Sequence, residues 1–240
     1  MQKEEFYKII SYYASKININ LNIEQKENFY KYMNLLLEWN ENINLTAITK
    51  PDEIILKHFI DSLTISKFIH ENAKVIDVGT GAGFPGIPLK IIRDDIEVTL
   101  LDSLNKRINF LNEVIKKLNL SKIEAIHSRV EDLAHKKEYR EKFDISTSRA
   151  VANLSTLSEY LLPLTRVGGK VIAMKGQEIN EEINNAKNAI NILNGKIDKI
   201  DSFYLYGKEM KRNNIIIEKV KNAPIEYPRR AGLPSKKPIV

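Results

Sequence analysis

The spacing of apolar residues divides the chain into a helical first part and an alternating second part. Within residues 1–70, apolar side chains return every three or four positions, which is the spacing of one face of a helix. Two of these series are Phe6, Ile9, Ile10 and Tyr13, and Phe29, Met33, Leu36 and Leu37. We therefore expect residues 1–70 to form helices that pack an apolar face on the rest of the protein.

Two local signals place the starts of helices in this first part. Asn22 is followed three residues later by Gln25, which resembles a capping box ahead of the second helix. A proline is tolerated in the first turn of a helix because its missing N–H group would have no partner there. A third helix is therefore expected to begin near Pro51 and to carry His58 and Phe59.

From residue 71 onward, short runs rich in β-forming residues alternate with helical stretches. The runs are Val75–Val78, Val98–Leu101, Ile123–His127, Phe143–Ser146 and Lys170–Met174. The clearest helix between them is expected over 105–118, where apolar residues form one stripe. Strands and helices that alternate in this way predict a parallel sheet with right-handed crossovers, covered by helices on both faces.

The last two β-like runs predict a hairpin that closes this sheet. Lys196–Leu205 and Asn214–Val220 are joined by a short loop around 206–208, which leaves no room for a helix. Strands connected by such a short loop must run antiparallel. The predicted fold is therefore α/β. It resembles the Rossmann-like fold of class I methyltransferases, a seven-stranded, mostly parallel sheet with an antiparallel last strand, here preceded by an N-terminal helical segment.

Four glycines follow the first predicted strand, in the stretch VIDVGTGAGFPGIP at residues 75–88. The residues from Gly81 to Gly86 fit the dinucleotide pattern G-x-G-x-x-G, which would indicate NAD. The residues from Gly79 to Gly83 fit G-x-G-x-G, which would indicate S-adenosylmethionine. Glycine lets a ligand approach the backbone closely and permits a positive φ, so a tight turn without a ligand is the less favoured interpretation.

Two acidic residues bear on the choice of cofactor. Asp102 ends the second predicted strand, where a carboxylate can hold both ribose hydroxyls of either cofactor. Asp77 lies two residues before the first glycine, where its charge would repel a pyrophosphate and attract the ammonium and sulfonium of S-adenosylmethionine. Asp77 and the terminal hairpin together favour S-adenosylmethionine.

The absence of certain residues and motifs narrows the range of possible methyl acceptors. The chain has no cysteine, which excludes disulfides, thiolate metal sites and the cysteine nucleophile that pyrimidine C5 methylation normally needs. After the fourth predicted strand it reads STSRAVANL (146–154), without the Asn/Asp-Pro-Pro-aromatic loop that is usual for methylation of exocyclic amines. A ring nitrogen such as guanine N7, a hydroxyl group or a small molecule remains.

The positive charge of the chain lies mostly at its end. The net charge is +6, and residues 201–240 carry nine basic and four acidic groups. Such an end suggests an anionic partner such as nucleic acid, although a solvated lysine surface explains it equally well. The sequence shows no signal peptide and no apolar run long enough to span a membrane, so we expect a cytoplasmic protein without a membrane partner.

Short stretches spread over nearly the whole chain form a specific pattern. They are LLLEWNENINLTAI (35–48), HFIDSL (58–63), VIDVGTGAGFPGIPL (75–89), LLDSLNKRINFL (100–111), SRVED (128–132), SRAVANL (148–154), MKGQ (174–177) and YPRRAGLPSKKPI (227–239). With them the chain resembles the RsmG family, also called GidB. The resemblance implies a class I enzyme of the bacterial cytoplasm that uses S-adenosylmethionine to methylate guanine N7 at one position in the decoding-region loop of 16S rRNA.

The resemblance also assigns residues to a site. The cofactor-binding residues that it implies, with the acidic residue before the glycines, are Asp77, Gly79, Gly81, Phe84, Asp102, Ser103, Val130, Glu131 and Arg149. Asp102 and Ser103 would hold the ribose, and Val130 and Glu131 would lie beside the adenine. The residues expected to contact RNA are Arg129, Arg149, Lys175, Arg212, Arg229 and Arg230. Because N7 has a free lone pair, neither a catalytic base nor a metal is expected.

The segments and partners follow from this interpretation. We expect residues 1–70 to be a helical extension packed on the catalytic domain, 71–222 to be the methyltransferase domain, and 223–240 to be a basic tail that contacts RNA and leaves the cofactor site alone. His58 and Asp61 are expected to pair with each other as a structural bond. The expected partner is 16S rRNA or the small ribosomal subunit, bound by a monomer.

Two other functions stay open from the sequence. The same fold serves methyltransferases that act on small molecules or proteins. A non-catalytic regulator could also keep a vestigial cofactor pocket. The positive tail and the absence of an inserted cap over the site favour RNA as the acceptor.

Overall fold

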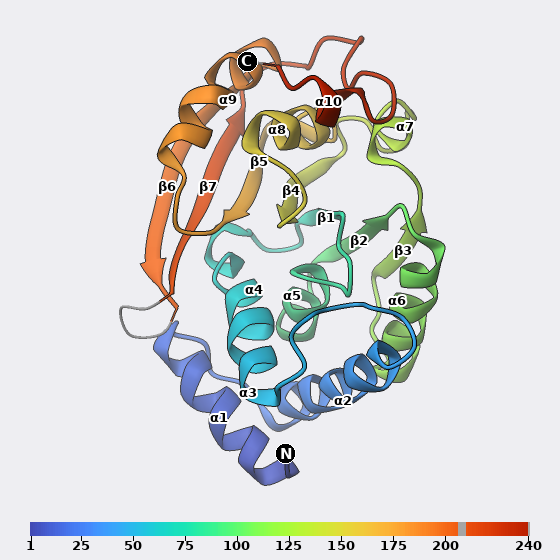
Figure 1. Cartoon of the computed structure of the whole chain (residues 1–240), viewed down its shortest axis with the longest axis vertical. Helices are drawn as coiled ribbons and strands as arrows, with labels where there is room; N and C mark the ends of the chain where they lie inside the picture. The colour runs from blue at the N-terminus through green and yellow to red at the C-terminus, as the bar shows by residue number, and fades with distance from the viewer. Residues whose placement is uncertain (206–209, 240) are drawn as a thin grey trace.

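A single sheet crosses the middle of the molecule, with helices packed on both of its faces (Figure 1). The computed structural model describes residues 1–205 and 210–239, and in these residues the sheet has seven strands. They are β1 (Lys74–Val78), β2 (Glu97–Asp102), β3 (Ile123–His127), β4 (Phe143–Arg149), β5 (Thr165–Lys175), β6 (Gly195–Tyr204) and β7 (Lys211–Lys219). Their order in the sheet is β3-β2-β1-β4-β5-β7-β6.

The direction of the strands confirms the predicted fold class. The pairs β1 with β2, β1 with β4, β2 with β3 and β4 with β5 are parallel. Strand β7 runs antiparallel to both of its neighbours, β5 and β6. The last two strands thus form the predicted hairpin, although its predicted loop around 206–208 lies outside the described residues.

The strand order places the ends of β1 and β4 at the centre of the sheet. The chain leaves β1 toward β2 on one side and later returns to β4 on the other side, so the sheet reverses its winding between β1 and β4. Ligands of open α/β sheets bind beyond the carboxyl ends of the strands at such a reversal. The glycine-rich segment that follows β1 is located there.

The first part of the chain forms the helices α1 (Lys3–Lys16), α2 (Ile23–Asn40), α3 (Pro51–Ile54) and α4 (Asp61–Leu63), and a short 3₁₀ turn at Ser66–Phe68. The capping box is confirmed, since the Asn22 side chain accepts a hydrogen bond from the Gln25 backbone and the Gln25 side chain accepts one in return. The third helix begins at Pro51 as predicted. Its middle, Ile55–Ile60, is a π-helix, which a search for the ordinary helical period does not reveal.

The remaining helices are α5 (Gly86–Ile92), α6 (Asn105–Lys117), α7 (Val130–Leu133), α8 (Leu154–Leu161), α9 (Asn180–Ile192) and α10 (Leu233–Lys236). Helices α5 to α9 divide between two hydrophobic cores, one on each side of the sheet. One core combines the N-terminal helices with α5 and α6, and the other contains α7, α8 and α9. Residues 1–70 therefore help to build one of the two cores that support the sheet.

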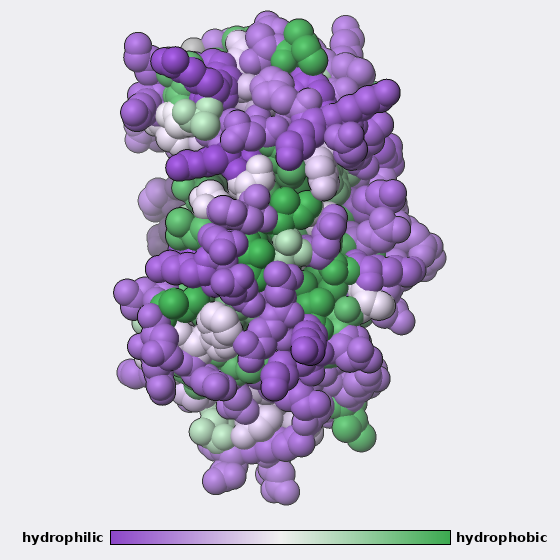
Figure 2. Space-filling view, turned by 90° about the vertical axis from the view of Figure 1, so that its right-hand side faces the viewer, coloured by the Kyte–Doolittle hydropathy of each residue, from purple (hydrophilic) through white to green (hydrophobic). Residues whose placement is uncertain are grey.

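On the face drawn in Figure 2 the surface is mostly hydrophilic, and apolar residues gather near mid-height. Among the described residues, no helix has both the length and the apolar character needed to cross a membrane.

Candidate cofactor site and adjoining cavity

The backbone after β1 turns sharply in the glycine-rich segment. Gly79, Gly81 and Gly83 all have positive φ angles, of 67°, 62° and 97°. A Cβ atom at Gly79 would lie 2.5 Å from Cγ2 of Val151, in the segment after β4. Glycine at this position thus permits both the turn and the close approach of the two segments.

Asp77 stabilises this turn through hydrogen bonds. Its Oδ2 atom accepts hydrogen bonds from the Thr80 hydroxyl at 2.6 Å and from the Gly86 N–H at 2.8 Å. The side chain is fully buried, and Oδ1 has no hydrogen-bond partner among the residues that the structure describes. Burial raises the pKa of Asp77 to about 6. Asp77 therefore shapes the loop directly, and its predicted attraction for the methionine end of the cofactor stays a prediction.

Asp102, at the end of β2, contacts both the glycine loop and the following turn. Its Oδ2 accepts hydrogen bonds from the Gly81 N–H at 3.0 Å and from Arg107 at 3.1 Å, and its Oδ1 accepts one from the Leu104 N–H at 2.9 Å. The carboxylate is thus fixed at the mouth of the loop. Ser103, the next residue, is exposed beside it.

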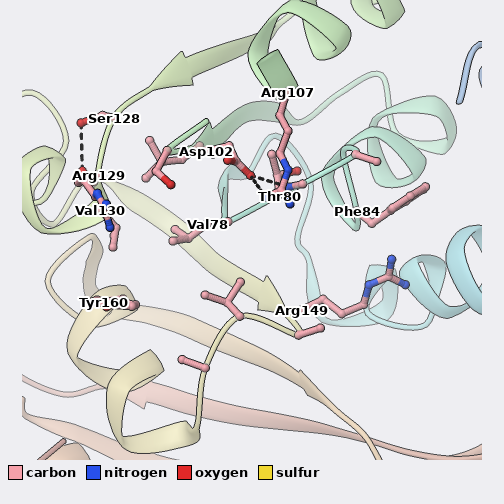
Figure 3. A pocket seen from close by; sticks show the side chains of 18 of the residues that line it. Val78, Thr80, Phe84, Asp102, Arg107, Ser128, Arg129, Val130, Arg149 and Tyr160 are labelled. Atoms are coloured by element: carbon pink, nitrogen blue, oxygen red, sulfur yellow. Dashed lines mark hydrogen bonds and ion pairs between the residues drawn. The ribbon is translucent and has the colours of Figure 1, made fainter. Parts of the chain in front are cut away.

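A cavity of about 540 Å³ lies above these groups. In Figure 3, Val130 and Tyr160 lie at one end of it and Phe84 and Arg149 at the other, with Asp102 between them. The predicted residues that the structure brings together around the cavity are Gly79, Gly81, Phe84, Asp102, Ser103, Arg129, Val130, Glu131 and Arg149. Asp77 is predicted to belong to this site but lies buried behind the loop.

These residues fit S-adenosylmethionine. The cofactor is elongated, with an adenosine at one end and a charged amino acid at the other. The apolar end at Val130 suits the adenine ring, and the carboxylate of Asp102 suits the ribose hydroxyls. A Cβ added at Gly81 would meet nothing within 4 Å, so the glycine leaves the cavity open above the loop.

The C-terminal segment forms part of the wall of this cavity. Ser235 lines it, and its hydroxyl is 2.9 Å from the hydroxyl of Tyr160. Glu131 is buried, and its Oε1 accepts a hydrogen bond from the Gly232 N–H at 2.8 Å. The tail is therefore part of the cavity wall, and the expectation that it leaves cofactor binding unaffected stays a prediction. Glu131 holds the tail, and its contact with adenine stays a prediction.

The two arginines of the tail differ in their surroundings. Arg229 binds Glu159 of α8, with Nη2 and Oε2 separated by 2.6 Å, and the Glu159 side chain is completely buried. Arg230 is exposed. Contact with RNA stays a prediction for both, but the structure gives Arg229 a structural partner inside the protein.

Arg149, at the end of β4, is held by the π-helical segment and α4. Its Nη1 donates to the Lys57 carbonyl and to Asp61 Oδ2, both at 2.9 Å, and its Nη2 lies 3.1 Å from His58 Nδ1. The guanidinium carbon lies 5.0 Å from the centre of the Phe84 ring. His58 and Asp61 thus share Arg149 as a partner, where the sequence had indicated a bond between the two.

His58 is neutral in this arrangement. Burial, followed by the charge of Arg149, lowers its pKa to about 3. Since Nδ1 faces the N–H of Arg149, Nδ1 acts as the acceptor, and Nε2 donates to the Thr46 hydroxyl 2.8 Å away. The imidazole ring stacks on Phe84 with 4.5 Å between the ring centres. His58 therefore orients both Arg149 and Phe84.

A second cavity, of about 410 Å³, adjoins the first. Its lining residues are Ile48, Lys57, His58, Asp61, Arg149, Ala150, Met174, Lys175, Gly176, Arg212 and Asn214. His58, Arg149 and Ala150 line both cavities. The structure thus brings together three of the arginine and lysine residues that were predicted to contact RNA, namely Arg149, Lys175 and Arg212.

Both remaining cations of this group have partners within the protein. Lys175 Nζ donates to the Ala152 carbonyl and to Glu182 Oε1, each at 2.6 Å. Arg212 Nε lies 3.4 Å from Asp61 Oδ1. Within the described part of the chain, no group of three or more acidic or histidine side chains could hold a metal ion.

The sequence pattern did not identify several residues of the site. Tyr160 and Ser235 lie far from any glycine motif, and nothing in their local pattern marks them. Thr80, by contrast, lies inside the motif, and its position between two glycines could have identified it as a partner of Asp77. Tyr32 of α2 donates a hydrogen bond to the Ala82 carbonyl in the loop, so the N-terminal helices also support the site.

Comparison with known proteins agrees with this geometry. The family model described as GidB, rRNA small subunit methyltransferase G, matches residues 25–211. The chain is 55% identical over 228 residues to the ribosomal RNA small subunit methyltransferase G of Desulforamulus reducens, with 94% of this chain and 95% of that protein covered. It is 51% identical over 237 residues to the protein of the same name from Clostridium perfringens, with 98% and 99% covered.

A solved structure supports the fold independently. A SAM-dependent methyltransferase from Aquifex aeolicus superposes with a TM-score of 0.54 at 17% sequence identity, covering 72% of this chain and 96% of that one. At this identity the likeness concerns the fold alone. The family match, by contrast, covers most of the sequence, and the chain therefore belongs to the GidB family, that of rRNA small subunit methyltransferase G.

Proposed function

We propose that this protein transfers a methyl group from S-adenosylmethionine to N7 of a guanine in the decoding-region loop of 16S rRNA. The observation that carries the proposal is the cofactor cavity, which ends at Arg149 beside a second cavity lined by cations. The relatives named above, at 51% and 55% identity, are themselves called ribosomal RNA small subunit methyltransferases.

The bound cofactor would supply an electrophilic methyl group on a sulfonium. The residues around the cavity would hold the cofactor and orient it. Asp102 and the Gly81 backbone would fix the ribose end, and Val130 with Tyr160 would enclose the adenine. Phe84, with Arg149 and His58 packed against it, would form the wall where the methyl group is transferred. Alignment of two reactants at attack distance supplies much of the rate in such a reaction.

N7 of guanine needs no general base, because its lone pair carries no proton. This agrees with the neutral, fully hydrogen-bonded state of His58. The methylated purine is a cation, and a nearby carboxylate or carbonyl group would stabilise the charge that develops. Asp61 is the carboxylate that lines the second cavity, where it binds Arg149.

The acceptor implies the setting in which the protein works. We also propose that the protein acts as a monomer. An acceptor in the small ribosomal subunit would place the protein in the cytoplasm. N7 is inaccessible in the deep groove of paired RNA, so the target nucleotide must be unpaired or turned out of its stack when it binds.

The acceptor class can be tested directly. Three reactions are run in parallel, each with the protein and labelled S-adenosylmethionine. The first contains small subunits from an unmethylated strain, the second contains subunits that already carry the methyl group, and the third contains a cell extract freed of ribosomes. We expect label only in the RNA of the unmethylated subunits. Label in extract proteins or small molecules would favour another enzyme of this fold. Binding of the cofactor without any transfer would favour a non-catalytic regulator.

A further inference from the structure

The second cavity lies where an acceptor must enter. It shares His58, Arg149 and Ala150 with the cofactor cavity, so a group bound in it can reach the end of the cofactor cavity next to Phe84 (Figure 3 shows this end). Its walls come from the π-helical segment, from α4 and from the ends of β4, β5 and β7. A volume of about 410 Å³ is ample for a single nucleoside.

The charge of the second cavity suits a nucleotide. Among the described residues, the cations Lys57, Arg149, Lys175 and Arg212 line it, together with the carboxylate of Asp61. Lys57 and Arg212 are the more accessible cations, with side chains that are 30% and 27% exposed. Exposed cations at the rim can bind a phosphate, which positions a nucleotide without reading its base.

One oxygen of the Asp61 carboxylate has no hydrogen bond within the described residues. The side chain is 6% exposed, and its Oδ2 is bound to Arg149. Its Oδ1 lacks a hydrogen-bond partner among residues 1–205 and 210–239, and it forms an ion pair with Nε of Arg212 at 3.4 Å. A buried carboxylate oxygen without a hydrogen bond is costly, so a donor from a ligand would be favourable there.

We propose that the second cavity binds the target guanosine of the RNA and that Asp61 recognises its 2-amino group. In this arrangement Arg212 turns from Asp61 to a phosphate of the RNA, and the released Oδ1 accepts a hydrogen bond from the base. Arg149 keeps Oδ2 in place from the side of the cofactor cavity. The inference rests on the proposed function, since it assigns the acceptor of that same reaction.

This contact would give the enzyme its choice of base. Guanine carries a 2-amino donor, whereas adenine has only a C–H group at that position. A site built to bond a donor of its substrate discriminates strongly against an analogue that lacks it, because the buried acceptor is then left unpaired. The proposal therefore concerns specificity, in addition to binding.

Inosine provides the sharpest test, because it lacks only the 2-amino group and keeps N7. Small subunits are reconstituted with 16S rRNA, joined from segments, that carries guanosine or inosine at the target position. Methyl transfer is measured at saturating S-adenosylmethionine. We expect the wild-type protein to methylate the guanosine subunits roughly tenfold or more faster, the scale of one hydrogen bond to a charged group.

The variant Asp61→Asn assigns this preference to its residue. Its amide oxygen would stay with Arg149, which offers only donors, and its amino group would then face the 2-amino group of the base. We expect the guanosine-to-inosine ratio to fall to near one. Equal wild-type rates on both subunits would overturn the inference while leaving the proposed function intact, and a preference that survives in Asp61→Asn would overturn the role of Asp61.

Arg212→Gln tests the cavity without altering Asp61, and Arg166→Gln is its matched control. Arg166 is an exposed arginine at the beginning of β5, whereas the second cavity lies at the other end of this strand. It pairs with Asp144 of β4. We expect Arg212→Gln to raise the KM for small subunits about tenfold, with unchanged affinity for S-adenosylmethionine, and the control to behave as wild type. A rise for Arg212→Gln no larger than that of the control, including no rise at all, would contradict entry of the RNA into this cavity. Failure of the wild type to methylate guanosine subunits would overturn the function and this inference together.

Discussion

Charged side chains that are buried in this protein set the geometry of its site. Asp77 and Asp102 each accept hydrogen bonds from the backbone of the glycine loop, and Arg149 is enclosed by three acceptors and an aromatic ring. Such groups have few alternative partners, so they hold one conformation of the loop. Their removal should therefore affect ligand binding and stability in ways that can be separated.

The pKa of Asp77 predicts a pH dependence of stability. Burial raises its pKa from 3.8 to about 6, so the carboxyl group favours the folded state below pH 3.8 and loses this contribution as the pH rises through 6. The loss is roughly 3 kcal/mol, at about 1.4 kcal/mol for each unit of pKa. Asp77→Asn carries no charge at any pH. We expect its unfolding free energy, relative to wild type, to increase between pH 4 and pH 7.5 in urea titrations. A difference that does not change with pH would contradict this.

Asp102→Ala should weaken binding of S-adenosylmethionine by roughly 1.5–3 kcal/mol, because a charged acceptor for the ribose hydroxyls is lost. Asp102 also binds Arg107, so Arg107→Met serves as the control that keeps the carboxylate. Calorimetry should show a large loss of affinity for Asp102→Ala and a small one for Arg107→Met. Equal losses would contradict a direct contact between Asp102 and the ribose.

Arg149→Lys keeps the charge but loses the planar fork. A lysine has one nitrogen for the three acceptors that Arg149 now serves, and it cannot pack a guanidinium plane on Phe84. We expect normal folding in thermal melts but a loss of most methyl transfer to small subunits at saturating S-adenosylmethionine. Turnover near the wild-type rate would mean that the positive charge alone is sufficient.

At the scale of elements, the local sequence pattern predicted most of what positions the site. The runs of β-forming residues found the strands, and the glycine motif found the loop after β1. Local patterns cannot reveal partners that are distant in sequence, such as Asp61 and Arg149, which are 88 residues apart, or Glu159 and Arg229, which are 70 apart. The π-helical turn that carries His58 was missed because it interrupts the ordinary helical period.

The C-terminal segment tests the importance of partners that are distant in sequence. Arg229 neutralises the fully buried Glu159, while the neighbouring Arg230 is exposed. Loss of one partner of a buried ion pair costs roughly 3–5 kcal/mol, whereas changes at exposed positions stay within about 0.5 kcal/mol. We expect Arg229→Gln to lower the free energy of unfolding by several kcal/mol, and Arg230→Gln to leave it nearly unchanged. If both variants weaken RNA binding equally and leave stability unchanged, the tail acts on RNA as the sequence first indicated.

Truncation after Pro224 tests the same segment against the cofactor. It removes Ser235 from the cavity wall and leaves Glu131 without the Gly232 N–H. We expect weaker binding of S-adenosylmethionine by calorimetry, together with a lower melting temperature. Unchanged cofactor affinity in the folded, truncated protein would show that the wall at Ser235 contributes nothing to binding.

At the scale of the whole molecule, the two cores meet at the sheet and the two cavities meet at its carboxyl edge. The N-terminal core brings His58, Asp61 and Phe84 to Arg149, and the other core carries Tyr160 and the C-terminal segment to the end of the cavity at Val130. Neither half alone encloses the site. The sequence predicted the fold and the cofactor loop well, but the second cavity depends on contacts between segments that only the folded chain brings together.

The position and the atom that receive the methyl group test this account most directly. Small subunits from an unmethylated strain are incubated with the protein and S-adenosylmethionine, and the RNA is then reduced with borohydride and cleaved with aniline, which cuts at N7-methylguanosine. We expect one new cut in 16S rRNA, at a guanine in the decoding-region loop, that depends on the methyl donor and is lost with Arg149→Lys. Methylated RNA that aniline does not cut, or cuts at many guanines, would contradict the account.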